Sequence, residues 1–150
     1  RAIQLAAGSL GHFLFAAALS TPSGKKNSYA HNNHPDGILI EVRNSSPISY
    51  SNAFVKPAAV GERELIEQSI FQLGSYAHDL DVGYGKPDNR FWYSPNLKYR
   101  LQYQEKIADK VKESDLTDNN FKSMDEIVKA VVKLTGYDWE EVKKVTINGG

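Results

Sequence analysis

The sequence contains no cysteine and has no excess of charge of either sign. The absence of cysteine excludes disulfide bonds, thiolate zinc sites and a cysteine nucleophile, and it suits a reducing compartment, so we expect a cytoplasmic protein. The sequence has eighteen basic and eighteen acidic residues, which gives a formal net charge of +0. A protein that grips polyphosphate over a broad surface is usually basic, so any contact with nucleic acid must be local.

The sequence also lacks a convincing membrane span. Its most apolar stretch, residues 1–20, is interrupted by Gln4, Ser9 and His12, and it is too polar and too short for the roughly 20 apolar residues that a span needs. A cleaved signal peptide is the alternative, because Arg1 precedes an apolar run that ends in small residues. The chain begins with Arg rather than Met, and we expect an interior part of a longer protein.

Residues 1–20 are instead predicted to form a core helix. Apolar residues recur at spacings of three and four, which places them on one helical face: Ile3, Ala7, Leu10, Leu14 and Ala17. Gly8 and Gly11 lie near that face and would let another backbone approach closely, at some cost in helix propensity.

The middle of the chain is predicted to mix strands and helices. Ile38, Ile40 and Val42 alternate with Leu39, Glu41 and Arg43, which indicates a strand with the first set buried and the second on a mixed outer face. A further short extended segment is predicted over residues 48–54. A helix follows from about Glu62 to Leu80, and its predicted inward residues are Leu65, Ile66, Ser69, Ile70, Leu73, Ala77 and Leu80.

The last third is predicted to hold two capped helices. Ser123 and Glu126 have the spacing of a capping box, and Gly136 is placed to end the helix that they begin. Asp138 with Glu141 repeats the arrangement before a short final helix. No internal repeat or low-complexity tract is found.

A loop over residues 23–29 holds the best candidate ligand-binding groups. Its two ammonium groups, amide and hydroxyls suit phosphate oxygens without reading bases, and its glycine allows close backbone approach; the candidates are Lys25, Lys26, Asn27, Ser28 and Tyr29. The glycine spacing of a P-loop is missing. An ordinary solvated turn has the same composition.

Other chemistry-bearing residues are weaker candidates. His31, His34 and Asp36 could together bind a metal, but no fourth ligand is evident, so we predict a polar loop, no metal site and no cofactor. Asp79 and Asp81 could be a catalytic pair, although solvated charge at a helix end explains them without an identifiable acid and base.

An aromatic segment follows residue 90. Phe91, Trp92, Tyr93, Tyr99 and Tyr103 are interleaved with basic residues, as in a platform on which nucleobases stack. The same composition is typical of a loop packed over a sheet. We favour packing, because aromatic side chains usually bury their large apolar area.

Three stretches in fixed order resemble a known family. They are the helix 1–20 running into Gly24-Lys25 and Ser28-Tyr29-Ala30, then Asp36 with the strand 38–42, and then Pro47-Ile48-Ser49-Tyr50-Ser51-Asn52-Ala53-Phe54 with a long helix closing at Gly83-Tyr84-Gly85. This order is similar to the C-terminal portion of the CasC-like backbone subunit of the type I-E CRISPR surveillance complex, Cascade. The likeness covers residues 1–85 and is weak beyond residue 86.

The resemblance implies an α+β fold, the C-terminal portion of a modified RRM-like (ferredoxin-like) palm with flanking helices. Residues 1–85 would be the C-terminal part of that core, and residues 86–150 would add the aromatic segment and the capped helices of the same domain. Lys25 occupies the matching basic position, and its neighbours 26–29 are suitable donors.

The function implied by the resemblance is non-enzymatic binding of CRISPR RNA for antiviral defence. The partners would be the guide RNA, neighbouring copies of the subunit, the other Cascade subunits and, through the guide, target DNA. Two alternatives of other classes are a protein-protein interaction domain that uses the aromatic segment, and a metal-dependent hydrolase that uses His31, His34 and Asp36.

Overall fold

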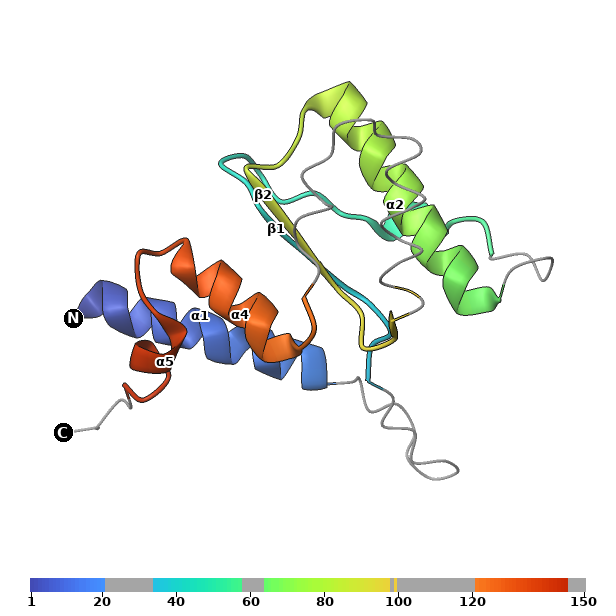
Figure 1. Ribbon diagram of the computed structural model, residues 1–150. Coiled ribbons are helices and arrows are strands. Elements are labelled where there is room, and N and C mark those ends of the chain that lie inside the picture. Colours follow the sequence, from blue (N-terminus) through green and yellow to red (C-terminus); the bar gives the residue numbers. More distant parts are fainter. Residues whose placement is uncertain (21–33, 58–63, 98, 100–120, 146–150) are drawn as a thin grey trace. The chain divides into compact units, whose positions relative to one another are not determined.

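The chain forms two compact units, which are described here one at a time. A computed structural model describes residues 1–20, 34–57, 64–97, 99 and 121–145 (Figure 1). One unit comprises Arg1–Pro35 with Phe121–Gly150, and the other comprises Asp36–Asn120, a division at different points from the sequence-based boundary at residue 85. The first unit is helical in its described part, and the second pairs a two-stranded sheet with a long helix. The predicted α+β class is therefore confirmed.

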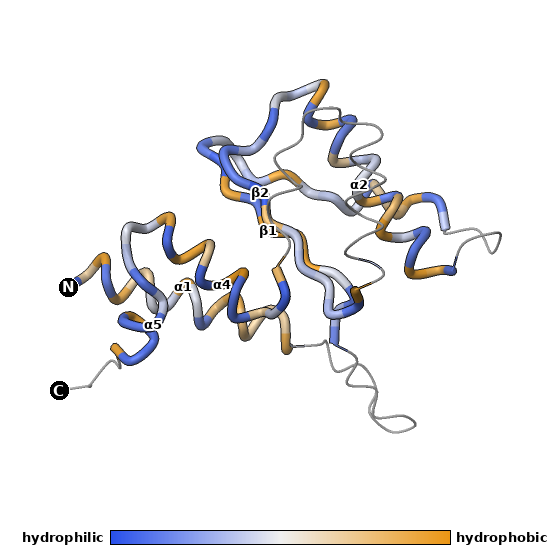
Figure 2. The backbone as a smooth tube through the Cα atoms, viewed as in Figure 1, coloured by the Kyte–Doolittle hydropathy of each residue, from blue (hydrophilic) through white to orange (hydrophobic). Residues whose placement is uncertain are grey.

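The helical unit brings the two ends of the chain together. It contains α1 (Ala2–Leu19), α4 (Met124–Lys133) and α5 (Trp139–Val142), and α1 contacts both of the others. Figure 2 shows hydrophobic and hydrophilic residues alternating along α4, as expected of a helix with one buried face. The core of the unit consists of residues at most 3% exposed: Ala7, Val128, Val132, Trp139 and Val142.

The two glycines of α1 lie where α5 packs against this helix. A Cβ at Gly8 would lie 2.9 Å from the carbonyl oxygen of Val142, and a Cβ at Gly11 would lie 2.6 Å from Cε3 of Trp139. Both distances are too short for a side chain, so only glycine allows α5 to pack this closely. The predicted close approach of another backbone is confirmed at Gly8, whereas at Gly11 the neighbour is the side chain of Trp139.

The predicted buried face of α1 is right only in its middle. Ala7 is buried and Leu14 packs against the core, but Ile3 is 66% exposed and Ala17 is also exposed. The reason is length: α1 spans about 27 Å, whereas the ten-residue α4 spans about 15 Å. The partner helices of this unit are too short to cover both ends of α1.

By length and composition alone, α1 could also cross a membrane. Its mean hydropathy is 1.5, and 17% of it is buried. The core helix of a soluble protein and a signal sequence meet the same criteria. Length and composition therefore do not distinguish a membrane span from either of these.

Side-chain caps fix the ends of the two C-terminal helices. Ser123 Oγ accepts a hydrogen bond from the backbone N–H of Glu126 (3.2 Å), while the Glu126 carboxylate accepts one from the N–H of Lys122 (2.7 Å). Gly136 has φ of 83°, the left-handed conformation that ends the chain's helical path after α4. Before α5, the Asp138 carboxylate accepts from Glu140 N–H rather than from the predicted position 141.

The described part of the second unit is built on one antiparallel strand pair. β1 (Ile38–Val42) pairs with β2 (Asn89–Tyr93), with Leu39 opposite Trp92 and Glu41 opposite Arg90. Between them lie a 3-10 turn, η1 (Ser51–Phe54), and the helix α2 (Leu65–Tyr84). The extended segment predicted over residues 48–54 is therefore wrong in its second half, which is a helical turn.

The predicted orientation of β1 is wrong. Leu39 packs against a core of Ile70, Trp92 and Tyr99, and the side chains of Glu41 and Arg43 are only 9% exposed. The face predicted to be outward is thus largely buried. Both faces of this strand carry apolar residues, and the large ring of Trp92 opposite Leu39 decides which one packs against α2.

The inward face of α2 is correctly predicted in its centre and wrong at its start. Ile70 and Ala77 are buried and Leu73 packs against the core, whereas Leu65 and Ile66 are 58% and 37% exposed. The helix continues past Leu80 to Tyr84 and ends at Gly85, whose φ of 91° is left-handed.

The aromatic segment is part of the core. Phe91, Trp92 and Tyr99 are at most 6% exposed, which confirms packing over base stacking for these three rings.

The packing at Gly11 yields a stability prediction. Gly11→Ala should lower the free energy of unfolding by about 2 kcal/mol, because the new methyl group would overlap the indole ring of Trp139. Urea denaturation followed by circular dichroism measures this change. The control is Gly83→Ala: this helical glycine has open space at its Cβ position, so the change should be neutral or stabilising by up to about 1 kcal/mol. Equal stabilities of the two variants would contradict the packing.

Candidate functional site

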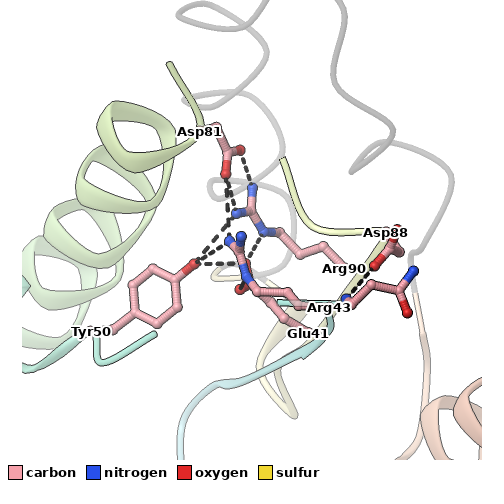
Figure 3. Close-up of polar contacts among 7 residues, drawn as sticks. Glu41, Arg43, Tyr50, Asp81, Asp88 and Arg90 are labelled. Atoms are coloured by element: carbon pink, nitrogen blue, oxygen red, sulfur yellow. Dashed lines mark hydrogen bonds and ion pairs between the residues drawn. The ribbon is translucent and has the colours of Figure 1, made fainter. Parts of the chain in front are cut away.

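The candidate RNA-binding loop lies outside the described residues. Lys25, Lys26, Asn27, Ser28 and Tyr29 all fall between residues 21 and 33, so their grouping stays a prediction. The main polar cluster of the described sheet unit lies elsewhere, between β1, β2, α2 and the segment before η1. We call it the arginine network; Figure 3 shows its members, Glu41, Arg43, Tyr50, Asp81 and Arg90.

Arg90 is the centre of the arginine network. Its Nε donates to Glu41 Oε1 at 2.5 Å, and its two terminal nitrogens donate to the two carboxylate oxygens of Asp81 at 2.6 and 2.7 Å (Figure 3). The pairing with Asp81 is bidentate, the geometry that a planar guanidinium favours. One side chain of β2 therefore connects β1 with the last turn of α2.

Arg43 and Tyr50 surround the other side of Glu41. Arg43 Nε donates to Glu41 Oε2 at 2.8 Å, and the Tyr50 hydroxyl donates to Glu41 Oε1 at 2.7 Å. Arg43 Nη2 makes longer contacts, 3.4 Å to the Tyr50 hydroxyl oxygen and 3.9 Å to Asp81 Oδ1. Glu41 thus accepts hydrogen bonds on both oxygens from three side chains.

The network is buried and electrically neutral. Each of its four charged side chains is at most 9% exposed, and its two carboxylates balance its two guanidinium groups. Isolated charges at this burial would be costly, and pairing with hydrogen bonds offsets that cost. A hydrogen bond from Asn44 N–H to Asp88 Oδ2 (2.7 Å) adds a link at the same end of the strand pair.

The pKa values in the network favour the charged forms. Burial by itself would raise the pKa of Glu41, but hydrogen bonds from Arg43 and Tyr50 and the charge of Arg90 lower it below its usual 4.5. Burial and the neighbouring Glu41 raise the pKa of Tyr50. A carboxylate held by two guanidinium groups is a poor general base, and the network is accordingly suited to holding three elements together.

A cavity of about 300 Å³ opens beside the network. It lies between β1 and the segment that follows it, and its lining residues are Leu39, Glu41, Arg43, Ser45, Pro47, Ile48 and Tyr50. The cavity joins apolar walls to the buried polar groups of the network.

Sequence reasoning missed this network. The interpretation of Asp81 as solvated charge is wrong, because its side chain is 7% exposed and pairs with Arg90; Asp79 is exposed as predicted. Asp81 is buried because β2, which carries Arg90, lies beside the end of α2. One local signal was present: Glu41 interrupts an otherwise apolar strand, and a charge there requires a partner.

The possible metal ligands are not brought together by the described residues. His34 and Asp36 are both exposed, and His31 is outside the described ranges. Within those ranges, no group of three histidine or acidic side chains could hold a metal ion.

Removing one charge from the network should destabilise the protein. Asp81→Asn should lower the free energy of unfolding by about 3 kcal/mol, because it leaves the buried Arg90 without its bidentate partner. Asp79→Asn, an exposed position on the same helix, should change it by less than about 0.5 kcal/mol. Urea denaturation compares the two variants, and a matched, small effect at both positions would rule out a stabilising role for the pair.

The lowered pKa of Glu41 predicts loss of stability in acid. A carboxylate whose pKa is lower in the folded state stabilises that state fully above its unfolded value, about 4.5, and this contribution disappears as the pH falls through the folded pKa. Glu41→Gln should therefore be less stable at neutral pH and should lose less stability on acidification. The denaturation midpoints of the unchanged protein and of Glu41→Gln are to be measured across this pH range. If Glu41 were not paired, the two curves of midpoint against pH would be parallel.

Comparison with known proteins identifies the family. The profile of the CT1975-like protein family matches residues 2–130, which include both strands, α2 and most of α4. No curated protein matches the sequence. The matched range covers well over half of the chain and contains every member of the arginine network. The chain therefore belongs to the CT1975-like family of CRISPR-associated proteins.

Proposed function

We propose that the protein is a non-enzymatic, RNA-binding backbone subunit of a type I-E Cascade complex, in which it holds the CRISPR guide RNA for antiviral defence. The observation that carries the proposal is membership of a CRISPR-associated family over residues 2–130. The finer assignment to a type I-E backbone subunit rests in addition on the resemblance of the three ordered stretches in residues 1–85. The proposed partners are guide RNA, neighbouring copies, other Cascade subunits and, through the guide, target DNA in the cytoplasm.

The charge of the chain suits such a role. In RNA-guided complexes, pairing by the guide supplies sequence specificity, and the protein needs to hold only the backbone and its shape. A chain with a net charge of +0 can do this through a local cluster of cations. Lys25 and Lys26, with the donors of Asn27, Ser28 and Tyr29, are the proposed cluster.

The state of the polar groups supports a binding role over an enzymatic one. Both carboxylates of the arginine network are held by guanidinium groups, whereas a general base needs a carboxylate able to accept a proton from substrate. The hydrolase alternative depends on His31, for which the structure gives no position. The interaction-domain alternative loses support, because Phe91 and Trp92 are buried and offer little surface to a partner.

Co-purification tests the proposed function. Expressed with its neighbouring genes and a CRISPR array, the protein should carry RNA of uniform repeat-spacer sequence, which sequencing would identify. An intact complex that contains no RNA would refute the proposal and favour the interaction domain.

A second measurement tests the two lysines of the loop over residues 23–29. Lys25→Ala with Lys26→Ala should weaken RNA binding and reduce the slope of log affinity against log salt by up to about 1.4, the value for two lost contacts to single-stranded phosphate. Lys122→Ala with Lys133→Ala removes the same charge from exposed positions near α4 and should leave the slope almost unchanged. Equal slopes for the two double variants would exclude the loop as the site of contact.

A further inference from the structure

The cavity beside the arginine network has the features of a small ligand site. Its volume of about 300 Å³ is at the lower end of the range for ligand pockets. Leu39, Pro47 and Ile48 provide apolar wall, and Arg43 and Tyr50 provide polar groups. A pocket with mostly apolar walls and a few fixed polar groups suits a small ring with hydrogen-bonding edges.

Arg43 has a donor that no described residue uses. Its Nε is bound to Glu41 and its Nη2 makes only the longer contacts to Tyr50 and Asp81. The remaining nitrogen, Nη1, makes no hydrogen bond with any described residue, although the side chain is only 9% exposed. Nη1 is not among the fully buried unpartnered atoms of the described residues, and Arg43 lines the cavity. A ligand that brings an acceptor to this guanidinium would therefore gain a charge-assisted hydrogen bond.

The neutrality of the network selects the kind of acceptor. Glu41 lies 2.8 Å from Arg43 Nε, and a phosphate bound to the same guanidinium would stand close to that carboxylate. The two negative charges would repel each other. An uncharged acceptor, such as a carbonyl oxygen on a flat ring, avoids this repulsion and can also lie against Pro47 and Ile48.

We infer that the cavity binds one nucleobase of the RNA, with Arg43 Nη1 donating to a base carbonyl oxygen or ring nitrogen and Ile48 and Pro47 covering the ring. Single-stranded RNA is usually recognised in this way, by bases turned out of the stack and bound through their edges. The inference rests on the proposed function, because it needs RNA as the ligand. It adds a base contact to a protein whose proposed grip is otherwise on the backbone.

A pair of tryptophan variants tests the inference without disturbing the network. Ser45 lines the cavity and has no part in the ion pairs, whereas its neighbour Ser46 is exposed and is not a lining residue. Ser45→Trp should fill the cavity and weaken binding of oligouridine about tenfold, the effect of losing one bound base. Ser46→Trp should bind as the unchanged protein does. Circular dichroism confirms that both variants are folded.

Two further probes distinguish a contact with an RNA base from a contact with an RNA phosphate. Oligouridine that contains thiouridine should cross-link, on irradiation, to the peptide that contains residues 39–50, and abasic RNA of equal length should bind both tryptophan variants equally. Equal affinity of the two variants for oligouridine, or cross-links only to other peptides, would overturn the inference while RNA binding stands. If the unchanged protein binds neither the oligomer nor guide RNA, the proposed function fails as well.

Discussion

The bridge from Arg90 to Glu41 and Asp81 is the interaction on which the sheet unit depends. A two-stranded sheet is marginal in water, and it needs a further element packed on it to persist. Here the apolar contact among Leu39, Trp92 and Ile70 covers one end of the strands. The guanidinium of Arg90 joins the same three elements at the other end. Apolar packing and a charged bridge therefore act on a single face of the sheet.

Burial of four charges is not an efficient way to gain stability. A well-packed apolar core of the same volume is often as stable or more so. What a fixed set of charges adds is specificity of arrangement, because a shift of one residue in strand register would separate Glu41 from Arg90 and leave both buried without a partner. We regard the network as the device that sets the register of β1 on β2 and the position of the end of α2.

The helical unit follows a different principle, in which shape is decisive and charge is secondary. Gly8 and Gly11 remove side chains where α5 approaches, and Trp139 fills the space beside Gly11. The indole N–H is satisfied by Asp125 at 3.1 Å, so the ring is fixed at both its apolar and its polar edge. The family match ends at residue 130, but this core continues through α5 to Val142. In this chain, residues beyond the matched range are thus part of the same core.

Local features were determined by the sequence itself. The helix over residues 1–20, the strand at 38–42, the cap at Ser123 and the close approach at Gly8 and Gly11 all follow from interactions within a few residues or from the size of one side chain. The order of three stretches also indicated a CRISPR-associated family.

Only the tertiary structure decided which distant residues meet. Glu41 and Arg90 are 49 positions apart, and nothing in the spacing of either predicts that Arg90 joins Glu41 to Asp81. The sequence likewise did not determine which face of β1 is buried, because apolar residues occur on both faces. The buried face is set by Trp92, which comes from another strand. The cavity beside Arg43 exists for the same reason. Hydrophobic periodicity reports burial along one element, whereas a site is made by the elements that packing brings together.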